Sequence, residues 1–172
     1  MKTNVLVLLA LFVGIGAILH TIVPPILLGV KPDMMLSMMF LGILFFPKAK
    51  YVLILGLATG VISALTTSAP GGQISNMVEK PITAFIFFAL LLIVPKNINT
   101  KWSAPVLVAI GTIVSGSVFL YMALNVVGLL PGSFLPMFVG VVLPAALLNV
   151  IFILVIYPIT KNIFDRSRVQ LA

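Results

Sequence analysis

Uncharged apolar stretches run through this sequence from end to end, with very little charge between them. Its 172 residues include only ten basic and three acidic side chains; 62% are hydrophobic, and the mean hydropathy is +1.31. A soluble domain carries about a quarter charged residues, because a polar surface must cover its core. So few charges cannot form that surface. The apolar residues must therefore face lipid.

Charged, Pro-rich and Gly-rich breaks divide the apolar sequence into segments of the kind that cross a membrane as helices. The connections between these segments are short, and no linker separates domains, so we expect residues 1–172 to form a single domain. We predict an all-α integral membrane protein, a bundle of six transmembrane helices at residues 5–23, 34–46, 51–67, 82–94, 104–130 and 134–160.

The basic residues predict the orientation in the membrane, because Lys and Arg accumulate on the cytoplasmic side. With a cytoplasmic N-terminus, eight of the ten fall on that side: Lys2, Lys48, Lys50, Lys96, Lys101, Lys161, Arg166 and Arg168. The outer side keeps Lys31 and Lys80, each with an acid nearby. We therefore expect both termini in the cytoplasm. The net charge of +7 is explained by this topology and indicates no nucleic-acid partner.

Residue types that support catalysis or metal binding are scarce. The chain has no cysteine and one histidine, which excludes disulfides and thiolate metal sites. It shows no Ser, His and acid set at readable spacing, no cytoplasmic acidic cluster for magnesium and no phosphate-binding motif. We expect no enzyme, no metal and no cofactor, and the chain cannot hydrolyse ATP alone.

Two of the predicted spans are too short to cross the membrane. Residues 34–46 and 82–94 are 13 residues each, about 20 Å of helix against a hydrocarbon core of about 30 Å. If their cytoplasmic ends are held at the surface, four charges lie below the outer surface: Lys31, Asp33, Glu79 and Lys80. Charges at such depth require partners or a water-filled cavity.

These four charges have two interpretations. In the first, they line a binding cavity for a zwitterion: Asp33 or Glu79 holds an ammonium group, and Lys31, Lys80 or a helix N-terminus holds a carboxylate. In the second, each acid stabilises the N-terminus of its own helix and pairs with the neighbouring lysine. We favour the cavity, because two of only three acids are recessed on the same side.

Residues 66–76 form an uncharged connection that is rich in hydrogen-bonding groups and contains Gly71 and Gly72. A connection of this kind can close over a small ligand, with Gln73 and Asn76 in contact with it. The alternative is a plain outer loop in which Ser75 or Asn76 caps the next helix.

Other side chains are candidates for the cavity wall. A satisfied histidine at a helix end is the alternative for His20, and helix packing is the alternative for Asn149. The polar candidates are His20, Tyr121, Asn125 and Asn149. The aromatic candidates, which could stack on a ring or simply face lipid, are Phe85, Phe88, Phe134 and Phe138.

Several short motifs together resemble the bacterial tryptophan transporter family TrpP over essentially the whole chain. They are Lys31-Pro32-Asp33-Met34-Met35-Leu36, Ala64-Leu65-Thr66-Thr67, Gly72-Gln73-Ile74-Ser75-Asn76-Met77, Glu79-Lys80-Pro81 and Leu143-Pro144-Ala145-Ala146-Leu147-Leu148-Asn149. The resemblance implies uptake of L-tryptophan across the bacterial cell membrane, a substrate that suits a zwitterion cavity with aromatic walls.

That family is in turn similar to the substrate-binding S components of energy-coupling-factor transporters. This similarity implies an S-component-like bundle that captures ligand from outside and depends on an energy-coupling transmembrane subunit with two ATPases. The S components pack on that subunit through an Ala-x-x-x-Ala patch in their first helix; here the patch is Ala10 to Gly14, with Gly in the second position. Two alternatives remain open, an S component for another ligand such as a vitamin and a non-transporting membrane scaffold.

Overall fold

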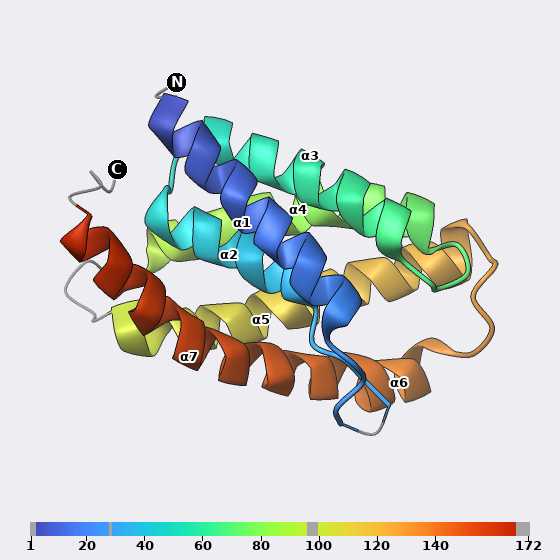
Figure 1. Ribbon diagram of the computed structural model, residues 1–172. Helices are drawn as coiled ribbons and strands as arrows, with labels where there is room; N and C mark the ends of the chain where they lie inside the picture. The colour runs from blue at the N-terminus through green and yellow to red at the C-terminus, as the bar shows by residue number, and fades with distance from the viewer. Residues whose placement is uncertain (1–2, 28, 96–99, 168–172) are drawn as a thin grey trace.

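Helices account for almost all of the regular structure in this protein. The computed structural model describes residues 3–27, 29–95 and 100–167, with only the backbone at 100–102. Figure 1 shows the long helices lying side by side. In chain order the elements are α1 (Thr3–Ile22), α2 (Met34–Phe45), α3 (Ala49–Thr66), α4 (Gly72–Ile93), α5 (Thr100–Tyr121), the π-helical η1 (Met122–Val126), α6 (Phe134–Met137), the π-helical η2 (Phe138–Val142) and α7 (Leu143–Arg166).

The helices fit the predicted membrane protein. Within the described residues, five helical segments are long and apolar enough to cross a membrane: 3–22, 49–66, 72–93, 103–126 and 134–166. The sixth is α2, which has 12 residues, so the prediction of a short second helix is confirmed. The chain is therefore a multi-pass, all-helical membrane protein.

The short helix α2 lies at the centre of the bundle, where it contacts α1, α3, α4, α5 and α7. Almost all of its residues are buried. Phe40 stacks on Phe87 of α4 with ring centroids 4.0 Å apart, and Phe45 stacks on Tyr157 of α7 at 5.3 Å. Because the neighbouring helices shield α2 from lipid, it does not need to match the thickness of the membrane.

The prediction of a short fourth helix is wrong. Helix α4 begins at Gly72 instead of Ile82 and has 22 residues. Glu79 and Lys80 lie inside it, and both side chains are buried in protein, so their charges do not end the helix at the lipid boundary. The backbone of α3 comes very close here: a Cβ added to Gly56 would lie 2.9 Å from the Cα of Pro81.

The connection between α3 and α4 is also shorter than predicted. Gly71 is the N-cap of α4 and has a φ of +73°, a left-handed conformation that favours glycine. Gly72, Gln73 and Asn76 belong to the helix, so the prediction that they form a loop is wrong, and neither Ser75 nor Asn76 caps α4. The predicted fifth span, 104–130, begins earlier, at Thr100, and its helical run ends at Val126.

Candidate functional site

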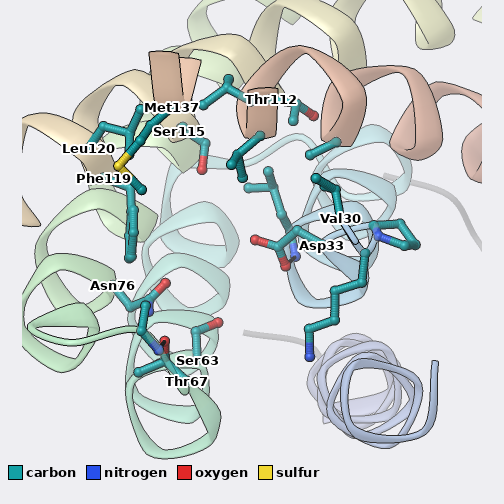
Figure 2. Close-up of a pocket in the computed structure, with 18 of the residues that line it drawn as sticks. Val30, Asp33, Ser63, Thr67, Asn76, Thr112, Ser115, Phe119, Leu120 and Met137 are labelled. Atoms are coloured by element: carbon teal, nitrogen blue, oxygen red, sulfur yellow. Dashed lines mark hydrogen bonds between the residues drawn. The ribbon is translucent and has the colours of Figure 1, made fainter. Parts of the chain in front are cut away.

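A cavity of about 380 Å³ lies among residues at the starts of α2 and α4 and along α5 (Figure 2). Figure 1 shows the starts of α2 and α4 at the end of the bundle away from the first turn of α1 and the last turn of α7. The size of the cavity lies within the usual range for small-molecule sites. The polar and charged side chains that line it are His20, Lys31, Asp33, Ser63, Thr67, Ser68, Asn76, Lys80, Thr112 and Ser115. The apolar ones include Val30, Leu36, Phe119, Leu120, Leu130, Met137, Val141, Val142 and Ala145. The cavity therefore combines charged groups with apolar walls.

Asp33 is fixed where α2 begins. Its Oδ1 accepts a hydrogen bond from the backbone N–H of Leu36 at 2.9 Å, so Asp33 is the N-cap of the helix. Its Oδ2 lies 2.7 Å from the Nζ of Lys80. The backbone N–H of Asp33 donates to the Oδ1 of Asn149 at 2.9 Å. These contacts tie the start of α2 to α4 and α7.

Lys80 is shared between two carboxylates. Besides Asp33, its Nζ contacts the Oε1 of Glu79 at 2.5 Å, and the side chains of Lys80 and Glu79 are only 2% and 1% exposed. The Oε2 of Glu79 accepts hydrogen bonds from Ser115 at 2.8 Å and from Thr83 at 3.1 Å. Glu79 does not line the cavity; it lies behind Lys80 and holds that side chain in place.

The ion pairs follow the second sequence interpretation only in part. Glu79 does pair with its neighbour Lys80, but Asp33 pairs with Lys80 rather than with its own neighbour Lys31. The Nζ of Lys31 instead donates to the backbone carbonyl of His20 at 3.0 Å. His20 lines the cavity, with its Nδ1 3.8 Å from the Oδ1 of Asp33. Asp33, Lys80 and Glu79 thus form one network, and Lys31 lies outside it.

Asn149 supports the cavity from behind. It is fully buried, and besides accepting from the backbone of Asp33 it donates through Nδ2 to the Oγ1 of Thr112 at 3.2 Å. The amide needs a partner inside the bundle and finds one on each of two helices. Asn149 positions Asp33 and Thr112, both of which line the cavity.

Three of the predicted polar residues lie away from this cavity. Gln73 is exposed in the first turn of α4. Tyr121 and Asn125 are exposed where α5 passes into η1, and the Nδ2 of Asn125 donates to the backbone carbonyl of Tyr121 at 3.3 Å. The four predicted phenylalanines are not among the residues that line the cavity, and two of them, Phe85 and Phe134, are exposed.

Sequence reasoning named Tyr121 of α5 and missed the residues of that helix that do line the cavity. Thr112, Ser115, Gly116 and Phe119 all line the cavity. Their spacing of three, four and seven residues places them on one face of the helix, and this periodicity was a signal that could have identified them. Gly116 is needed for close packing, because a Cβ there would lie 2.6 Å from a Cγ of Val142 in η2. Ser63, Thr67 and Met137 were missed without a comparable signal.

The sequence matches the family described as "Tryptophan transporter TrpP" over residues 2–165. A protein of Bacillus subtilis (strain 168) named "Probable tryptophan transport protein" is 57% identical over 167 residues, which cover 97% of this chain and 96% of the relative. A relative with the same name from Clostridium acetobutylicum is 39% identical over 94% of each of the two chains. Another from Clostridium perfringens is 36% identical over 96% of each chain. No solved structure matches the chain significantly.

Proposed function

The chain belongs to the TrpP family of tryptophan transporters, and on this premise we propose that its cavity captures L-tryptophan at the outer face of the bacterial cell membrane. The family assignment confirms the resemblance seen in the sequence and favours tryptophan transport over catalysis, over capture of a vitamin and over a scaffold role.

One observation carries the proposal: the cavity offers both signs of charge beside an apolar wall. A zwitterion needs a carboxylate for its ammonium group and a cation for its carboxylate. Asp33, whose side chain is 28% exposed, receives the ammonium group. Lys80 already faces two carboxylates. Lys31 makes one hydrogen bond within the described part of the chain, to a backbone carbonyl, so Lys31 receives the ligand carboxylate. The indole ring lies against Phe119 and Met137.

The location of charge supports a cavity that opens outward. The first residues of α1 and the last residues of α7 lie at the end of the bundle away from the cavity (Figure 1). Exposed basic residues at that end are Lys48, Lys50, Lys161 and Arg166; Lys2, Lys96 and Arg168 lie outside the described residues, as does the side chain of Lys101. By the positive-inside rule this end faces the cytoplasm, so the cavity faces outside.

Uptake of labelled tryptophan by cells that express Asp33→Asn tests the proposal. Asparagine also caps helices well, so α2 keeps its start while the charge is lost. A hydrogen bond to a charged group contributes about 1.5–3 kcal/mol, so we expect the apparent affinity to fall about 10- to 150-fold. Asp165→Asn is the matched control, because Asp165 is exposed near the end of α7 and far from the cavity. Normal uptake by Asp33→Asn at equal membrane levels contradicts the assignment.

We also propose that α1 packs against an energy-coupling membrane subunit. Ala10 and Gly14 lie one turn apart on its exposed face, and a Cβ added to Gly14 would meet nothing within 4 Å. The similarity to S components stays a prediction. Its test is co-purification of a transmembrane subunit and two ATPases with the tagged protein. Ala10→Leu should abolish the association, whereas Ala89→Leu, on an exposed face of α4, should preserve it. Equal recovery with both variants refutes this interface.

A further inference from the structure

We infer that the hydroxyl of Ser63 accepts a hydrogen bond from the indole N–H of the ligand, which makes Ser63 a specificity-determining residue for tryptophan. The inference rests on the proposed function. Ser63 lies near the end of α3, lines the cavity and is 4% exposed. Its Oγ has no hydrogen-bond partner among the described residues.

An unpartnered hydroxyl at this place is unusual, because buried polar groups in proteins are nearly always hydrogen-bonded. The other two buried hydroxyls of the cavity wall are engaged: Ser115 donates to Glu79, and Thr112 accepts from Asn149. The nearby amide of Asn76 donates to the backbone carbonyl of Gly72 at 2.8 Å. Ser63 is therefore the one buried hydroxyl of this wall that has no hydrogen-bond partner among the described residues, and its oxygen is free to accept from a ligand.

The position of Ser63 suits the indole rather than the charged end of the ligand. Figure 2 shows Ser63 with Thr67 and Asn76 on one side of the cavity, Phe119, Leu120 and Met137 on another, and Asp33 apart from both groups. A ligand whose ammonium group meets Asp33 extends its side chain between these two sides. An indole has an apolar face and a single N–H donor on its edge, and that donor needs an acceptor when it is buried.

This contact predicts selection against rings that lack the donor. A site built to hydrogen-bond a ligand group discriminates against an analogue without that group, because the site's own polar atom then stays unsatisfied. Phenylalanine lacks the indole N–H, and so does 3-benzothienylalanine, which keeps the shape of tryptophan and replaces the N–H by sulfur. The second compound isolates the hydrogen bond from differences in ring size.

The test measures binding of tryptophan and of 3-benzothienylalanine to the purified full-length protein and to Ser63→Ala. The wild-type protein should prefer tryptophan by about tenfold or more, and Ser63→Ala should reduce this preference to within about twofold. Ser63→Thr keeps a hydroxyl and should keep the preference. Ser63→Cys, with a weak acceptor, should give an intermediate ratio and serves if Ser63→Ala proves poorly folded.

Thr59→Val is the matched control. Thr59 lies one turn earlier on α3 and is 1% exposed, and its hydroxyl has no partner in the part of the chain that the structure describes, but it does not line the cavity. Removing its hydroxyl should leave the preference for tryptophan unchanged. If Ser63→Ala and Ser63→Cys retain the full preference, or if Thr59→Val loses it equally, the inference fails. If the wild-type protein binds no tryptophan, the proposed function fails instead, so the two failures are distinguishable.

Discussion

Replacing Lys80 with methionine removes the ammonium group that Asp33 and Glu79 share, while it keeps most of the length and apolar packing of the side chain. Glu79 is then left with an uncompensated charge in a position that is only 1% exposed. Breaking a buried ion pair by removing one partner costs about 3–5 kcal/mol. At about 2–4 °C per kcal/mol for a chain of this length, we expect the unfolding temperature to fall by about 6–20 °C.

Double variants show which carboxylate accounts for that loss. Glu79→Gln in the Lys80→Met background removes the uncompensated charge, and the amide oxygen still accepts from Ser115, so we expect most of the stability to return. Asp33→Asn in the same background should restore less, because Asp33 is 28% exposed to the cavity and solvent already stabilises part of its charge. The two substitutions at 79 and 80 should therefore be strongly non-additive.

The assay is thermal unfolding of the purified variants in one detergent, with monodispersity checked before each measurement. If Lys80→Met unfolds within about 2 °C of the wild-type protein, the buried network does not contribute as argued. The reasoning would also be refuted if the double variant Glu79→Gln, Lys80→Met lost as much stability as the two single variants together, because the two side chains would then act independently.

Three further substitutions test the cavity. Lys31→Met should weaken binding of tryptophan about tenfold or more and leave binding of tryptamine, which has no carboxylate, nearly unchanged in a competition assay. Asn149→Leu leaves the backbone N–H of Asp33 without its acceptor, so it should cost about 1–3 kcal/mol in thermal unfolding and also lower tryptophan affinity. Gly116→Val forces the added side chain against Val142, 2.6 Å from the position of the new Cβ, and should reduce uptake at equal expression.

Local sequence patterns were sufficient to predict that the chain is a bundle of membrane helices. The apolar segments predict the helices because the hydrophobicity of a span is carried by its own residues and needs no partner. The start of α2 was also readable, since Pro32 and Asp33 are typical of a helix N-terminus and Asp33 does cap α2. The start of α4 was predicted wrongly because the prediction also used local sequence alone. A charged pair before Pro81 looks like a helix boundary unless both charges are known to be buried.

The sequence by itself determined that this chain is a helical membrane protein of the tryptophan transporter family. It also identified Lys31, Asp33, Glu79 and Lys80 as charges that need partners or a cavity. Only the tertiary structure decided that Lys80 pairs with Asp33, 47 residues away, and that Phe119 rather than Phe85 lines the cavity. The small and polar residues of α5 mark one face of that helix, but helices that are apolar on all sides carry no strong sign of which face turns inward. The rotation of each helix is set by packing against its neighbours, as where Gly116 meets Val142, and that rotation brings the binding residues together.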